Sequence, residues 1–151
     1  MQRPQAKGLS PIAKTISTLD RLVREEASYH VELQEQGMRV LKTEEQVKKL
    51  AAHPEDEGNA VWMLRQERMA YEETKNVMSK MEQLAREAME KLQGLVIDER
   101  HRGIDHVIRC TQRAEQAKEG DIDETAIQEA METIRRAKEA MPSLSEPVSE
   151  S

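Results

Sequence analysis

The chain of 151 residues has no phenylalanine, one tryptophan, two tyrosines and one cysteine. Strands favour β-branched and aromatic side chains, so this scarcity speaks against a β fold. The single cysteine, Cys110, excludes an intrachain disulfide and a zinc site made of several thiolates. No apolar run approaches the length that crosses a bilayer, and the first residues lack the apolar region of a signal peptide. We therefore expect a cytoplasmic protein that makes no membrane contact.

Acidic and basic residues are both abundant. Charged residues make up 34% of the chain, the net charge is −6, and the isoelectric point is near 5.4. An acidic chain has no overall field that attracts phosphates, so we expect no nucleic-acid partner. The remaining composition is rich in Ala, Glu, Lys, Leu, Arg and Gln, which lose little side-chain freedom in a helix. These features predict an all-α fold of about one domain.

The first predicted helix covers 11–52 and follows a flexible N-terminus at 1–9. Ser10 suits the N-cap and Pro11 suits the first helical position. The apolar residues then follow the alternating three and four spacing of a heptad seam. This seam consists of Ile12, Ile16, Leu19, Val23, His30, Leu33, Val40 and Val47. A second set, Leu22, Tyr29, Met38 and Leu41, widens the stripe. A stripe of this width predicts a helix that faces two neighbours in a bundle.

The next stretch, from Val61 to Leu95, keeps a helical apolar period without Pro or Gly until Gly94. Within it, Ser79 and Glu82 have the S-x-x-E spacing of a capping box. We therefore predict a tight turn there, with one helix over 60–78 and another over 80–118. The segment 54–58, with Pro54 and Gly58, is expected to be a loop, and Asn59 the cap of the following helix.

The last predicted helix covers 121–141. Asp121 or Asp123 is its candidate N-cap, and Pro142 ends it. Its apolar face is Ile127, Ala130, Ile134, Ala137 and Met141. The residues 142–151 are predicted to form a disordered tail. Together these elements predict an elongated antiparallel three-helix bundle over 10–118, with spectrin-like coiled-coil packing and an extra C-terminal helical extension.

Residues suited to metal binding or catalysis are few. His101 and His106 are five residues apart, so they diverge around a helix instead of sharing a ligand. No Glu-x-x-His pair and no glycine-rich phosphate loop occurs. We expect a protein that is not an enzyme and has no catalytic residue, metal or cofactor. Trp62 and Met63 leave two interpretations open: packing between neighbouring helices, or part of a docking surface.

Two segments resemble helices of a known protein family. Leu19-Asp20-Arg21-Leu22-Val23-Arg24-Glu25-Glu26, followed by Tyr29, is similar to the signature of the first helix of the tubulin-binding cofactor A family. Leu64-Arg65-Gln66-Glu67-Arg68 through Glu72-Glu73-Thr74-Lys75, with Leu92 beyond, is similar to its second and third helices. The resemblance covers about 12–96. In the family a proline usually stands where this chain has Ser79, and the segment 97–151 exceeds the family's usual C-terminal region.

The resemblance implies a three-helix bundle that binds β-tubulin after its release from the chaperonin and before its assembly with α-tubulin. It implies β-tubulin as the partner, other tubulin-folding cofactors as further partners, a monomer, and a cytoplasmic location associated with the cytoskeleton. The candidate contacts are the outward polar residues of the matched motifs. They are Arg21, Arg24, Glu25, Glu32, Gln66, Glu67, Arg68, Glu72, Glu73 and Lys75. The alternative is a structural coiled-coil adaptor, or a subunit of a helical complex unrelated to tubulin, whose heptads pair with another chain.

Overall fold

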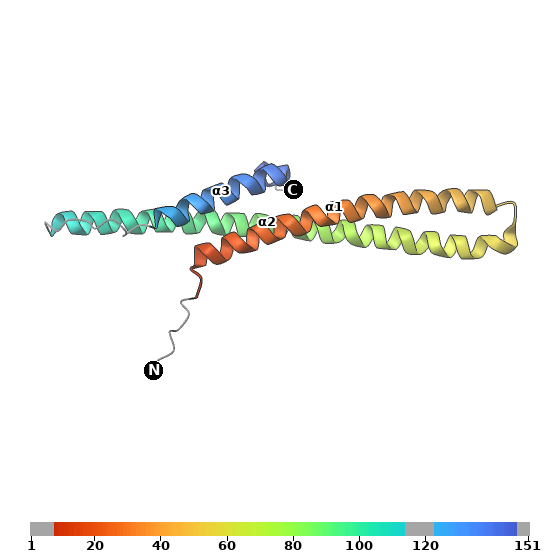
Figure 1. Ribbon diagram of the computed structural model, residues 1–151, viewed down its shortest axis with the longest axis horizontal. Coiled ribbons are helices and arrows are strands. Elements are labelled where there is room, and N and C mark those ends of the chain that lie inside the picture. Colours follow the sequence, from red (N-terminus) through yellow and green to blue (C-terminus); the bar gives the residue numbers. More distant parts are fainter. Residues whose placement is uncertain (1–7, 114–122, 148–151) are drawn as a thin grey trace, which may run out of the picture. The chain divides into compact units, whose positions relative to one another are not determined.

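A computed structural model of the chain describes residues 8–113 and 123–147, apart from the side chain of Cys110. Within these residues the chain forms α1 (Pro11–Leu50), α2 (Pro54–Gln112), α3 (Glu124–Ala140) and the short 3-10 helix η1 (Pro142–Ser145) (Figure 1). The prediction of an all-α helical bundle is confirmed. The predictions for 1–7, for 114–122 with Asp121, and for 148–151 lie outside the described residues.

The predicted turn at Ser79 is wrong. Ser79 is an exposed residue inside α2, which runs without interruption from Pro54 to Gln112, so the separate helices at 60–78 and 80–118 do not exist. A serine inside a helix costs only about half a kcal/mol relative to alanine. Opening the helix would cost the backbone hydrogen bonds of a whole turn, and Met78 and Met81 on either side are already half-buried along its packed face.

The predicted loop over 54–58 is also wrong, because these residues form the first turns of α2. Pro54 takes the first helical position, where its missing N–H costs nothing. Glu55, Asp56 and Glu57 follow in the first turn, where carboxylates are stabilised by the helix dipole. The connection between α1 and α2 is therefore only 51–53, and α1 ends slightly before the predicted 52.

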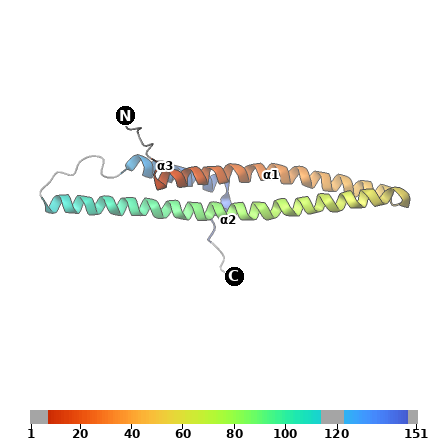
Figure 2. The same cartoon turned by 90° about the horizontal axis from the view of Figure 1, so that it is seen from below.

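The described residues divide into two compact units, and α1 and α2 contribute to both. In the unit of 24–83, α1 and α2 form an antiparallel hairpin (Figure 2). Its buried positions are Glu26, Gln36, Thr43, Ala60, Leu64 and Thr74. Arg68 pairs with Glu44 across the hairpin at 2.7 Å, and Arg39 pairs with Glu67 at 3.5 Å. Ion pairs and buried polar residues therefore make up much of the contact between α1 and α2 in the hairpin.

The other unit contains 8–23 of α1, 84–113 of α2, and α3 with η1. Its core is more apolar than that of the hairpin. The buried residues are Ile12, Thr15, Leu19, Leu22, Ala85, Ala88, Met89, Leu92, Val96, Ile127, Ala130, Thr133, Ala137, Met141 and Leu144. α3 is tied to its neighbours by Arg136 with Asp20 at 3.7 Å, and by the Asp123 backbone N–H donating to Glu99 at 3.4 Å.

Several predictions about helix ends hold. The Ser10 hydroxyl accepts a hydrogen bond from the Ala13 backbone N–H, so Ser10 caps α1. Asp123 caps α3 by accepting from the Ala126 N–H at 3.1 Å.

The predicted tail is ordered at its start: η1 follows Met141 directly and buries Leu144. The prediction of disorder from 142 is therefore wrong for these first residues.

The second apolar set on α1 behaves differently in the two units. Leu22 is buried, as expected of a helix with two neighbours, because α3 joins α2 against this part of α1. Met38 and Leu41 lie in the hairpin, where α1 meets α2 and no other described helix, and they are 65% and 63% exposed. The prediction of two neighbours along all of α1 therefore fails in the hairpin.

Candidate functional site

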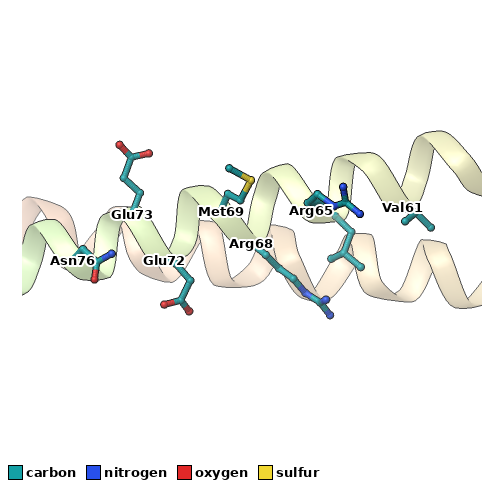
Figure 3. Close-up of a pocket in the computed structure, with 8 residues that line it drawn as sticks. Val61, Arg65, Arg68, Met69, Glu72, Glu73 and Asn76 are labelled. Atoms are coloured by element: carbon teal, nitrogen blue, oxygen red, sulfur yellow. The ribbon is translucent and has the colours of Figure 1, made fainter.

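A surface concavity of the hairpin lies along one flank of α2 and is called here the α2 groove (Figure 3). It has a volume of about 640 Å³. The residues that line it are Val61, Leu64, Arg65, Arg68, Met69, Glu72, Glu73 and Asn76. All of them come from about four turns of a single helix, so the groove is an open surface channel instead of an enclosed pocket. Such a shape suits contact with a macromolecule better than enclosure of a small substrate.

The sides of the α2 groove differ in chemistry. Arg68 and Glu72 project to one side of α2, while Met69 and Glu73 project to the other (Figure 3). Arg68 reaches Glu44 of α1, so this side meets the other helix of the hairpin. Met69 is 60% exposed and marks the side that faces outward. Leu64 is buried and forms the apolar floor.

Trp62 extends the outward side of the α2 groove. It precedes Met69 by seven residues, which is two helical turns, so both side chains lie in one row along α2. Gln66 and Glu73 fall in the same row. The Trp62 side chain is 59% exposed. Of the two interpretations of Trp62, packing between helices is therefore wrong, and a docking surface fits the structure.

The charged residues of the α2 groove fall into paired and unpaired groups. Arg68 binds Glu44, and Glu72 binds Lys75 at 3.3 Å. Arg65 and Glu73 form no ion pair or hydrogen bond with any residue that the structure describes. Arg65 lies nearer the start of the groove and Glu73 nearer its end. The groove thus presents a free positive charge followed by a free negative charge about two turns later.

The ten candidate residues from the sequence are not all at this groove. Arg68, Glu72 and Glu73 line it, and Gln66 lies in the row with Trp62. Lys75 stands 5.6 Å from the Tyr71 ring centre and pairs with Glu72 beside the groove. Glu67 is turned toward α1, where it pairs with Arg39.

The candidates on α1 lie elsewhere. Glu32 accepts a hydrogen bond from Gln36 of its own helix. It is twelve residues from Glu44, so it points about 120° away from the edge of α1 that meets Arg68. Arg24 is exposed and Glu25 half-buried in the same unit, and both have partners in the structure. Arg21 is exposed and belongs to the other unit. The structure therefore does not gather these four residues at the α2 groove.

Sequence reasoning missed Arg65, Met69 and Asn76 as groove residues. The signal was available in the helical period, because Val61, Arg65, Arg68 and Glu72 follow one another at the spacing of a single face. The candidates were selected polar residues of the matched motifs, so the apolar Met69 was passed over, and Asn76 lies just after the quoted motif.

The sequence profile of the tubulin binding cofactor A family matches residues 7–112, well over half of the chain. The chain belongs to the tubulin binding cofactor A family. This match extends past the 12–96 of the motifs and covers α1 and α2 to the last residue of α2. Comparison with curated proteins and with solved structures finds no match.

The family match leaves α3 and η1 outside its range. The α2 groove lies wholly inside it. The family is one of folding cofactors that act by binding, not of enzymes. None of the helices in the described residues is long and apolar enough to cross a membrane. Within those residues, no group of three or more His, Cys, Asp or Glu side chains is placed to hold a metal ion.

Proposed function

We propose that this chain is a tubulin-folding cofactor that binds β-tubulin after chaperonin release and before assembly with α-tubulin, and that the α2 groove is part of the contact. The family match carries the proposal, and the open, amphipathic groove supports it. Trp62 and Met69 offer apolar area, and Arg65 and Glu73 offer unpaired charges of opposite sign. We expect the protein to act in the cytoplasm and in association with the cytoskeleton, with other tubulin-folding cofactors as further partners.

A binder of this kind needs no nucleotide. A subunit separated from its partner exposes apolar surface that favours aggregation. A protein that binds the folded subunit and not its unfolded form stabilises it by mass action. Charges on an exposed helix mainly raise the association rate and select the partner, whereas buried apolar anchors hold the complex. The α2 groove and the adjoining Trp62 offer both charged and apolar residues within about four turns of α2.

The test measures binding of dissociated β-tubulin to the purified full chain. Trp62→Ala and Met69→Ala are each expected to weaken binding by about tenfold, because a buried anchor contributes about 1.4 kcal/mol or more. Met38→Ala is the matched control, since Met38 is similarly exposed but lies on α1 and does not line the α2 groove. Failure of the unchanged chain to retain β-tubulin would refute the function. Equal effects of Met69→Ala and Met38→Ala would refute the groove.

A coiled-coil adaptor is the second candidate function, and one observation favours it. Val31, Met38 and Leu41 of α1 are 59%, 65% and 63% exposed, and their spacing of seven and three places them on one face. Such a stripe can pair with the helix of another chain. Light scattering after gel filtration separates the two functions. A stable dimer that Met38→Glu dissociates would favour the adaptor, and a monomer would favour the tubulin cofactor.

A further inference from the structure

A second groove lies between α2 and α3 and is called here the α2–α3 groove. It is lined by Gln93, Val96, Ile97, Arg100, Met131 and Ile134, and has a volume of about 400 Å³. Both of its walls belong to the same unit of the structure. One wall is α3, which lies outside the family match. The groove therefore depends on a helix that the family profile does not include.

Apolar side chains of the α2–α3 groove remain half exposed. Ile97 on α2 is 52% exposed and Met131 on α3 is 50% exposed. The apolar row continues along α2 through Ile104, Val107 and Ile108, which are 54%, 46% and 49% exposed. Spacings of seven, three and one keep these residues within about 100° of one another around the helix. A contiguous exposed apolar patch on a soluble protein is most often an interaction site.

The charge in the α2–α3 groove is positive and unneutralised. Arg100 donates a hydrogen bond of 3.1 Å to the Met131 sulfur, which is a weak acceptor. Arg100 forms no ion pair within the part of the chain that the structure describes. Other arginines of this unit do: Arg102 binds Glu99, and Arg135 binds Glu132 at 2.5 Å. A carboxylate from a partner would give the Arg100 guanidinium a far stronger acceptor than a thioether.

We propose that the α2–α3 groove binds an amphipathic helix of a partner protein, with its apolar residues on Ile97, Met131 and Ile104 and a carboxylate on Arg100. Apolar anchors at one-turn spacing in a groove between two helices are the usual features of such recognition. This inference does not depend on the β-tubulin proposal, because the two grooves share no residue.

The local charge argues against a second copy of this chain as the occupant. In the stretch 97–108 of α2 the acidic residues are Asp98, Glu99 and Asp105, and each points about 100° or more away from Arg100 around the helix. A second copy paired along the apolar row would therefore bring no carboxylate of this stretch to Arg100. The concave shape between α2 and α3 also fits a helix better than a flat anionic membrane.

The experiment uses the full chain and a synthetic 18-residue helical peptide with Leu at one-turn spacing, flanked by Glu. A second peptide has Lys in place of every Glu, and phosphatidylserine vesicles are a third probe. The acidic peptide is expected to bind about tenfold more tightly than the basic one, since a charge-assisted hydrogen bond contributes about 1.5 kcal/mol or more. Arg100→Glu is expected to reverse this preference, and Met131→Ala to weaken binding of the acidic peptide.

Arg109→Glu is the matched control. Arg109 lies nine residues after Arg100 on the same helix and therefore points in the opposite direction. Arg109→Glu should therefore leave the preference for the acidic peptide unchanged. Circular dichroism should show equal helix content in all variants. Equal binding of both peptides would overturn the proposal, as would equal effects of Arg100→Glu and Arg109→Glu. Vesicle binding without peptide binding would assign the patch to a membrane surface, and a dimer broken by Ile104→Glu would assign it to a second copy; either result overturns the proposal.

Discussion

The guanidinium of Arg86 in α2 donates hydrogen bonds to the backbone carbonyl of Ser143 at 2.7 Å and to that of Glu146 at 3.0 Å. These carbonyls follow α3, in and just after η1, so one side chain of α2 holds the end of the C-terminal segment. Leu144 lies between them and is buried. The segment after α3 is thus fixed by one cation and one apolar anchor, although its composition alone predicts disorder.

Replacing Arg86 with alanine should loosen η1 and expose Leu144. We expect the free energy of unfolding to fall by about 1–2 kcal/mol, because two hydrogen bonds from a charged donor to partly exposed carbonyls are lost. Urea unfolding followed by circular dichroism measures this change. Arg135→Ala is the control, since the ion pairs of Arg135 with Glu132 and Glu139 lie within α3. If Arg135→Ala lowered the free energy of unfolding by as much as Arg86→Ala, the hydrogen bonds of Arg86 to the η1 segment would not be the cause of the loss.

Ser79 allows a direct test of the continuous α2. Because Ser79 is exposed and inside the helix, Ser79→Ala should raise stability by a few tenths of a kcal/mol. Ser79→Pro, the residue usual in the family at this position, should lower it by about 3 kcal/mol, because a proline removes a helical hydrogen bond and clashes with the preceding turn. Thermal unfolding distinguishes the outcomes. Destabilisation by Ser79→Ala, or tolerance of Ser79→Pro, would indicate a break in α2 at this position.

The sequence predicted best the parts whose apolar pattern is dense. Of the five residues assigned to the face of α3, Ile127, Ala130, Ala137 and Met141 are buried, and the cap Asp123 was among the two candidates. Strong periodicity with a capping residue leaves few alternative structures. The start of α1 at Ser10 and Pro11 was predictable for the same reason.

The wrong prediction of a turn at Ser79 comes from an ambiguous local pattern. Ser79 and Glu82 satisfy a capping-box pattern, but the same residues also tolerate a helix interior, so the local signal is ambiguous. Pro54 suggests the start of a loop in the sequence, but a proline begins a helix as readily as it follows the end of one. The candidate site could not be predicted from the sequence, because it depends on how side chains of α1 and α2 meet. No pattern along one helix shows that Glu67 pairs with Arg39 while Arg65 stays unpaired.

Gln36 is a buried polar residue with an unsatisfied atom. Its amide nitrogen donates to Glu32 at 3.1 Å, but its buried Oε1 has no hydrogen-bond partner. We expect Gln36→Leu to stabilise the hairpin by about 1–2 kcal/mol, because an unsatisfied buried acceptor is replaced by apolar area. Chemical denaturation measures the gain. Glu32→Ala removes the partner but leaves the buried oxygen, so it should give no gain. An equal gain in both variants would mean that the loss of the Glu32 contact, and not the buried oxygen, matters.

Glu99 should make stability depend on pH. The hydrogen bond from the Arg102 side chain lowers the pKa of Glu99, burial opposes this, and the Asp123 backbone N–H lowers the pKa further. A carboxyl whose pKa is lower in the folded state stabilises the protein above its unfolded pKa, and this contribution disappears as the pH falls through the folded pKa. The difference in unfolding free energy between the unchanged chain and Glu99→Gln should therefore shrink as the pH falls from 7 to about 3. A difference that stays constant over this range would contradict the lowered pKa.

The hairpin of 24–83 should open more readily than the other unit. Among its described residues the buried apolar side chains are Ala60 and Leu64, whereas the other unit buries Leu19, Leu92 and Ile127 almost completely. Local opening costs less where few apolar contacts must be broken, so backbone amides of the hairpin should exchange hydrogen faster. Hydrogen exchange followed by mass spectrometry measures both units in one experiment.

Leu92→Ala leaves a cavity in the core and should lower the free energy of unfolding by about 2–5 kcal/mol. It should speed exchange in 84–113 and α3 and bring their protection down toward that of the hairpin. Equal protection of the two units in the unchanged chain would contradict this prediction. It would mean that the few, mostly polar buried residues of the hairpin resist opening as strongly as the apolar core around α3.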